Sequence, residues 1–80
     1  MAQHSIKIYT TPWCGYCKMA KEYFQSKNLQ YEEYDVMADE TKRNEMVSKT
    51  GQLGVPVIDI DGKIVIGFDR AKVNEYLELK

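Results

Sequence analysis

The chain has 80 residues, a formal net charge of −1 at pH 7, 44% hydrophobic residues and 29% charged residues. This length suffices for a single modest core, so we expect residues 1–80 to form one domain. The composition is that of a folded globular protein and excludes a disordered chain. Because charges of both signs are interspersed, neither nucleic acid nor an anionic membrane is expected as a partner.

The sequence also bears on the compartment. No stretch approaches the roughly 18 apolar residues of a membrane-spanning helix, and the first residues lack the pattern of a secretory signal. We therefore expect a cytoplasmic protein with no membrane partner. The only two cysteines, Cys14 and Cys17, have two residues between them. In a chain that is not secreted, this spacing favours catalytic disulfide chemistry over a permanent bridge.

The first predicted element is a strand over residues 5–10, where apolar and polar residues alternate and β-branched side chains are frequent. Pro12 then restricts Thr11 to extended conformations and lacks an N–H group. The chain is therefore expected to turn before it reaches the cysteine pair.

An amphipathic helix is predicted from Gly15 to about Lys27. Its apolar residues recur at three- and four-residue spacing and include Cys17, Ala20 and Phe24. This face is expected to be buried, which makes Cys17 less exposed than Cys14. By this geometry Cys14 is the attacking thiol.

A cysteine at the start of a helix is stabilised as a thiolate, because free backbone N–H groups and the positive end of the helix dipole lie beside it. Such sites lower the ordinary thiol pKa of about 8.5 to roughly 3.5–7.5. A fall of two units requires about 2.7 kcal/mol, which exceeds what the dipole alone supplies. We therefore expect N–H hydrogen bonds to Cys14 from residues 16–17, with added positive potential from Lys18 and Lys21.

The middle and the end of the chain predict a short strand and two further helices. Residues 31–36 are acidic but carry spaced aromatic and β-branched side chains, which favours a strand. Asp39 is placed to cap a helix that runs to about Lys49, with Met46 and Val47 as its buried side. A last helix is predicted over residues 71–79.

Two apolar, β-branched runs, residues 54–60 and 63–66, are separated by Asp61-Gly62. This pattern predicts an antiparallel hairpin with a type I′ turn. The order is then β-α-β-α-β-β-α, and its first β-α-β unit implies a right-handed parallel crossover. The sequence thus predicts an α/β domain with a mixed four-stranded sheet flanked by three helices.

Two other interpretations of the cysteine pair are weaker. A structural disulfide that closes so short a loop contributes only about 2 kcal/mol by the loop-entropy estimate. A structural zinc site needs four ligands, and His4 is the only histidine. We therefore expect no metal ligands.

Three segments carry a resemblance to a known family: residues 8–17, which contain both cysteines, then Gly54-Val55-Pro56, and Gly67-Phe68-Asp69. With them the whole chain resembles a glutaredoxin, and it is most similar to short bacterial glutaredoxin-like proteins, including the YruB-type group. The resemblance implies a thioredoxin fold and a disulfide oxidoreductase. It also implies that Cys14 is the nucleophile and Cys17 the resolving thiol.

The resemblance further implies eight residues that bind substrate or glutathione: Thr11, Trp13, Tyr16, Val55, Pro56, Gly67, Phe68 and Asp69. Pro56 should follow a cis peptide bond, although a trans proline is the ordinary alternative. The backbone of Val55 should pair with the cysteinyl part of glutathione, and the Gly67–Asp69 turn should receive its γ-glutamyl end. For Asp69, a role as an ordinary helix N-cap is an equally weighted alternative. For Tyr16, the alternative is exposed apolar surface that covers the start of the helix.

The sequence departs from the common glutaredoxin pattern at four positions. Thr11 stands where a lysine is common, Gly54 where threonine is common, and Ile66 where a glycine often begins the later turn. Gly15 replaces the usual proline between the cysteines. Some glutaredoxins with glycine at that place bind a bridging iron–sulfur cluster with glutathione across a dimer.

From this resemblance we expect a monomer with disulfide-containing protein substrates and no tightly bound cofactor. Glutathione, as cosubstrate, or a flavoprotein reductase is the expected electron donor. The alternatives are a cluster-binding dimer, a reductant for one specific enzyme fed by a thioredoxin reductase, and an interaction module whose thiols are incidental.

Overall fold

The computed structural model describes residues 4–78. Its elements follow the predicted order and are β1 (Ile6–Thr10), α1 (Gly15–Ser26), β2 (Glu32–Asp35), α2 (Glu40–Thr50), β3 (Val57–Ile60), β4 (Lys63–Ile66) and α3 (Arg70–Leu77). Leu79, the predicted end of the last helix, lies outside the described residues. Within residues 4–78, no helix combines the length and apolar character that a bilayer span requires.

Three strands, β1, β2 and β3, are shorter than the sequence pattern suggests, and β3 differs most. The apolar run from Gly54 predicts a strand over residues 54–60, but β3 begins at Val57. Pro56 has no N–H group to donate to a sheet, and the Val55–Pro56 peptide bond is cis. Residues 51–56 therefore form a loop between α2 and β3, which we call the Pro56 loop.

The four strands form one mixed sheet in the order β2-β1-β3-β4. β1 pairs with β2 in parallel and with β3 antiparallel, and β3 pairs antiparallel with β4. The β3–β4 turn has positive φ angles of 54° at Asp61 and 89° at Gly62. Positive φ at both central residues is the requirement of a type I′ turn, which confirms the predicted hairpin.

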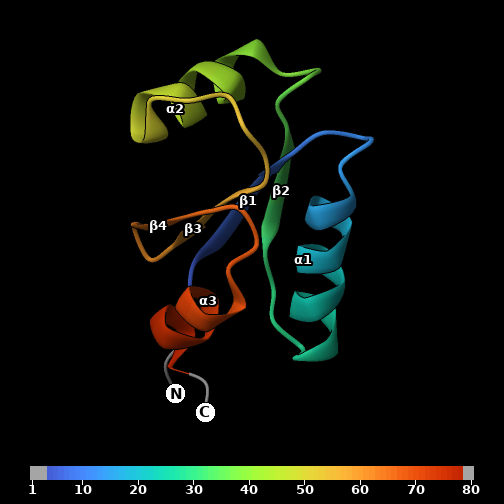
Figure 1. The fold of residues 1–80 in the computed structure, drawn as a ribbon, viewed down its shortest axis with the longest axis vertical. Coiled ribbons are helices and arrows are strands. Elements are labelled where there is room, and N and C mark those ends of the chain that lie inside the picture. Colours follow the sequence, from blue (N-terminus) through green and yellow to red (C-terminus); the bar gives the residue numbers. More distant parts are fainter. Residues whose placement is uncertain (1–3, 79–80) are drawn as a thin grey trace.

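Alternation along β1 divides the core between the two faces of the sheet. Ile8 joins the cluster that contains Ala20 and Phe24 of α1 and Val73 of α3. Its neighbour Tyr9 joins the cluster on the opposite face, with Met46 of α2. Accordingly α2 lies apart from α1 and α3 (Figure 1).

The buried side of α2 is smaller than predicted. Met46 is fully buried, but Val47 is only partly buried. The reason is that Glu45 and Lys49, on either side of Met46 along the helix, direct polar atoms to the strands. The helix therefore meets the sheet through one apolar side chain and a set of polar contacts.

Candidate redox active site

Cys14 is the N-cap residue of α1 and has an extended backbone, with φ −98° and ψ 111°. Its Sγ accepts a hydrogen bond from the backbone N–H of Cys17 at 3.1 Å, which is a contact expected from the sequence. Lys18 N–H donates to the Cys14 carbonyl oxygen at 3.2 Å. The sulfur therefore lies where the free N–H groups of the helix start converge.

The two cysteines form a disulfide, and their Cα atoms are 5.2 Å apart. This distance lies within the usual range of about 4.4–6.8 Å for disulfides. Cys17 is only 1% exposed, because it faces the core from the first turn of α1, whereas Cys14 is only partly buried. A partner in solution can thus reach Cys14 more easily than Cys17.

The charges on α1 contribute less than the sequence suggested. Lys21 Nζ lies 2.7 Å from Glu33 Oε2 on β2, and the same oxygen accepts a hydrogen bond from Thr10 Oγ1 at 3.0 Å. Lys21 therefore has a carboxylate of opposite charge beside it. Lys18, by contrast, lies exposed in the first turn of α1.

The side chain of Gln52, which was not predicted to have a role, holds the Pro56 loop by hydrogen bonds. Gly54 N–H donates to Gln52 Oε1 at 2.7 Å, and Gln52 Nε2 donates to the Gly54 carbonyl oxygen at 3.2 Å. A Cβ atom at residue 54 would lie only 2.6 Å from Gln52 Oε1. A side chain at residue 54 would therefore displace the Gln52 amide from this contact.

The Pro56 loop contacts the turn that precedes α3. Gly67 N–H donates to the Pro56 carbonyl oxygen at 2.8 Å, and Gly67 has a φ of 80°. Phe68 packs against the core, with its ring centroid 5.7 Å from that of Tyr23. Asp69 caps α3 by accepting the N–H of Lys72 at 3.2 Å. Asp69 is therefore a helix N-cap, which is one of the two roles considered for it from the sequence.

Comparisons with known proteins agree with this arrangement. The Glutaredoxin family profile matches residues 6–65. The chain belongs to the glutaredoxin family. A glutaredoxin-like 8.6 kDa protein of the rubredoxin operon of Clostridium pasteurianum is 48% identical over 73 residues, which cover 91% of this chain and 97% of that protein.

Two further relatives support the family and the fold. Glutaredoxin 3 of Escherichia coli K12 is 35% identical over 65 residues, covering 81% of this chain and 78% of that protein. The crystal structure of the thioredoxin-like protein BC3987 matches with a TM-score of 0.84 and 35% identity, over 90% of this chain and 99% of that one. The predicted thioredoxin fold is thereby confirmed, and as a glutaredoxin with a Cys14–Cys17 pair the chain is a thiol–disulfide oxidoreductase.

Exposed aromatic and apolar side chains lie close in sequence to the dithiol of this glutaredoxin. Trp13 is 82% exposed, Tyr16 66% and Met19 51%. Gly15, Tyr16 and Met19 line one shallow depression on the outer side of α1. Sequence analysis missed Met19, although its position three residues after Tyr16 places both on the same helix face.

An open hollow of about 270 Å³ lies beside Thr11. Besides Thr11 its lining comprises Val36, Met37, Arg43 and Leu53. Arg43 comes from α2 and donates to the Val36 carbonyl oxygen at 3.3 Å. Arg43 could not be singled out from the sequence, because residues 40–50 have the pattern of an ordinary charged helix.

Proposed function

We propose that this glutaredoxin reduces protein disulfides through two successive exchanges. The Cys14 thiolate attacks one sulfur of the substrate disulfide, and the other substrate sulfur leaves as a thiolate and takes up a proton. Cys17 then loses its proton and attacks Cys14. The second substrate thiol is released, two electrons have passed to the substrate, and Cys14 and Cys17 are left as a disulfide.

The observation that carries this assignment is the difference between the two sulfurs. Cys14 is partly exposed and accepts the Cys17 N–H, an interaction that favours its thiolate form. Cys17 is 1% exposed, so an incoming disulfide meets Cys14 first. Cys17 lies within bonding reach of Cys14 and is protected from solvent, as a resolving thiol needs to be.

Substrate binding is proposed at the Pro56 loop and the turn fastened to it. The main chain of Val55 is placed to pair with the residue that carries the attacked sulfur, and Pro56 shapes the loop from a buried position. At the turn, the side chain of Phe68 is packed into the core and Asp69 caps α3. We therefore assign to Gly67, Phe68 and Asp69 a role through their backbone groups, with Trp13 and Tyr16 flanking the bound sulfur.

We propose glutathione as the reductant of the oxidised dithiol. Thr11 lacks the charge of the lysine that is common at its position, but Arg43 lines the same hollow as Thr11. A guanidinium binds a carboxylate with two parallel hydrogen bonds, so Arg43 can take the glycyl carboxylate of glutathione. Two glutathione molecules then yield one glutathione disulfide and restore both thiols.

The dithiol itself carries the two electrons of each cycle, so the proposed reaction requires no resident cofactor, and glutathione acts as a cosubstrate. Both sulfurs come from one chain, which favours a monomer as the working unit. A dithiol that has to be reduced again after every cycle suits a compartment rich in reduced thiols. We therefore propose the cytoplasm as its location.

A coupled assay with one model disulfide tests the proposed donor. NADPH oxidation is followed with glutathione plus glutathione reductase, and separately with a thioredoxin reductase. We expect turnover with glutathione, and a KM for glutathione about tenfold higher in Arg43→Met. Lys27→Met, at the far end of α1, is the charge-matched control and should leave KM unchanged. Turnover with thioredoxin reductase alone would overturn glutathione as the donor.

A further inference from the structure

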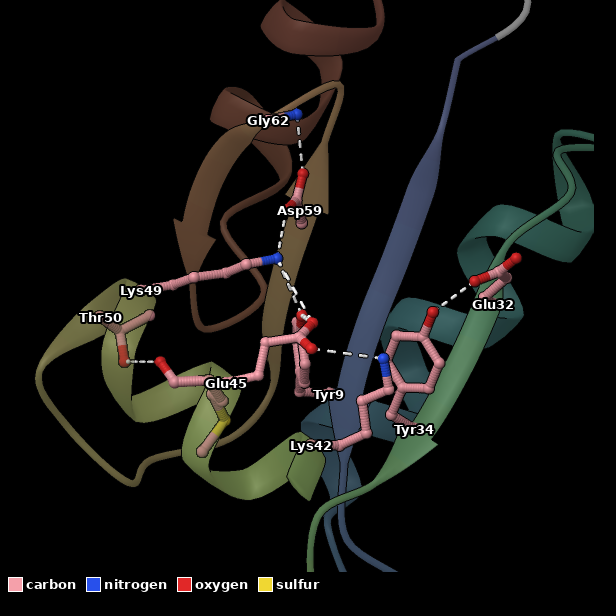
Figure 2. A network of polar contacts seen from close by, with 10 residues as sticks. Tyr9, Glu32, Tyr34, Lys42, Glu45, Lys49, Thr50, Asp59 and Gly62 are labelled. Carbon is pink, nitrogen blue, oxygen red and sulfur yellow. Dashed lines mark hydrogen bonds and ion pairs between the residues drawn. The ribbon is translucent and has the colours of Figure 1, made fainter. Parts of the chain in front are cut away.

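A polar network joins α2 to the sheet on the face opposite α1 (Figure 2). Lys49 Nζ donates to Asp59 Oδ2 at 2.9 Å and to Tyr9 Oη at 3.0 Å. Tyr9 Oη in turn donates to Glu45 Oε1 at 2.6 Å, an oxygen that lies 3.6 Å from Lys49 Nζ. We call these four residues, Tyr9, Glu45, Lys49 and Asp59, the Lys49 network.

The network pairs one carboxylate, that of Asp59, whose burial would otherwise be costly. Tyr9 is completely buried and Asp59 is 8% exposed, and a carboxylate withdrawn from water destabilises the fold unless it is paired. Two hydrogen bonds raise the pKa of Lys49: the bond with Tyr9 has the larger effect, and the bond with Asp59 adds to it. Burial raises the pKa of Tyr9, so at neutral pH its hydroxyl keeps the proton that it donates to Glu45.

Three members of the network lie close in sequence to segments of the candidate site. Lys49 is six residues before Val55, and Asp59 is three residues after Pro56. The Pro56 loop thus starts and ends close to the two partners of one ion pair. Tyr9, the third member, lies in β1, five residues before Cys14.

Packing links the network to the loop directly. Val55 packs against the cluster that contains Tyr9, Met46 and Val57. Asp59 also accepts a hydrogen bond from the Gly62 N–H with its other oxygen, at 2.8 Å. Both oxygens of its carboxylate are therefore hydrogen-bonded. The Lys49 ammonium group therefore joins α2, from which the Pro56 loop leaves, to Tyr9 of β1 and Asp59 of β3.

We propose that Lys49 is a positioning residue for substrate binding, because its contacts tie the start of the Pro56 loop to Tyr9 of β1 and Asp59 of β3. This inference rests on the proposed function, in which the main chain of Val55 holds the substrate. Removal of the ammonium group leaves the Asp59 carboxylate and the Tyr9 hydroxyl without their common partner. Because the loop binds the substrate but carries no reacting sulfur, the loss affects KM more than kcat.

The test compares Lys49→Met with Lys49→Arg, which keeps the charge, and with Lys42→Met as the matched control. Lys42 is on the same helix and also contacts Glu45, at 3.3 Å, but it lies over the ring of Tyr34 on β2 and does not touch Asp59. In Lys49→Met we expect KM for a protein disulfide to rise about tenfold, with kcat within about twofold. Lys49→Arg should recover most of the affinity, and Lys42→Met should match the wild type.

A network that only stabilises the fold would lower the melting temperature and leave KM unchanged at temperatures where the variant is folded. An unchanged KM in folded Lys49→Met, or an equal rise in Lys42→Met, would overturn the inference. If Lys49→Met does not fold, Asp59→Asn, which keeps the shape of the side chain, is judged by the same criteria.

Hydrogen exchange separates this inference from the proposed function. The Gly54 amide, measured without substrate, should exchange about tenfold faster in Lys49→Met than in the wild type. Unaltered exchange would show that the network does not order the loop, whatever the enzyme reduces. If Lys49→Met shows the faster exchange but the wild-type protein reduces no disulfide, the proposed function is contradicted and the role of Lys49 in ordering the loop is not.

Discussion

Gly67 donates its backbone N–H to the Pro56 carbonyl oxygen at 2.8 Å, which fastens the turn before α3 to the loop that contains the cis Val55–Pro56 bond. The two segments are 11 residues apart in sequence, and the β3–β4 hairpin brings them together. Two of the three segments that carry the family resemblance are thus joined by a backbone hydrogen bond.

The positive φ of Gly67, 80°, leads to a first prediction. In Gly67→Ala the Cβ atom is strained in the left-handed region, which costs about 1–2 kcal/mol. A loss of about 1 kcal/mol lowers the melting temperature of a domain this size by roughly 4–8 °C. Gly15→Ala is the control, because Gly15 is not among the glycines with positive φ, and a Cβ at either position meets nothing within 4 Å. Equal melting temperatures for the two variants would contradict the assigned role of Gly67.

A second prediction concerns the contact between Gln52 and Gly54. In Gly54→Ala the new Cβ displaces Gln52 Oε1, since the two would be 2.6 Å apart, and the loop loses its side-chain hydrogen bonds. We expect the free energy of unfolding to fall by about 1 kcal/mol. Gln52→Ala should cost about the same, and the double variant should cost no more than either single one. Additive losses in urea denaturation would show that the two residues act independently.

The third prediction is the pH dependence of stability. The hydrogen bond from Tyr9 lowers the pKa of Glu45 in the folded protein. The carboxylate therefore contributes stability above the pKa of the unfolded chain, and this contribution is lost as the pH falls through the folded pKa. Glu45→Gln should cost about 1 kcal/mol at pH 7 and progressively less toward pH 3.

Urea denaturation of both proteins from pH 7 to pH 3 measures this difference. Glu22→Gln removes one negative charge from the exposed side of α1 and controls for net charge. A gap between Glu45→Gln and the wild type that stays constant with pH would refute the assigned linkage.

A fourth prediction concerns the reactivity of the reduced thiols. Cys14, partly exposed at the start of α1, should react with iodoacetamide at pH 6 at least about tenfold faster than Cys17, which is 1% exposed. Single-thiol variants, Cys14→Ser and Cys17→Ser, allow each rate to be measured by mass spectrometry. The opposite order of rates would reverse the roles assigned to the two cysteines.

Local patterns in the sequence were sufficient for the elements and for the position of the dithiol. Alternation predicted β1, the Asp61-Gly62 pair predicted the hairpin, and the apolar spacing of α1 placed Cys17 in the core. Each of these depends on residues close together in the chain. The prediction that residues 1–80 form one domain stays a prediction, to be tested by coincident unfolding transitions with two probes.

Contacts between distant residues could not be predicted in the same way. Lys49 meets Tyr9 across 40 residues, a pairing set by the register of β1 and by the height of α2 over the sheet. The cis bond before Pro56 came only from the family resemblance, since most prolines follow a trans bond. Arg43 reaches the hollow beside Thr11 through the packing of α2 on the sheet, which local patterns do not reveal.

The most direct test of the central claim is to trap the mixed disulfide. Cys17→Ser and Cys14→Ser are each incubated, after reduction, with a protein disulfide and analysed by intact-mass spectrometry without reducing agent. The mechanism predicts a stable one-to-one covalent adduct on Cys14 in Cys17→Ser, and no adduct in Cys14→Ser. A stable adduct on Cys17, or full turnover by Cys14→Ser, would contradict it.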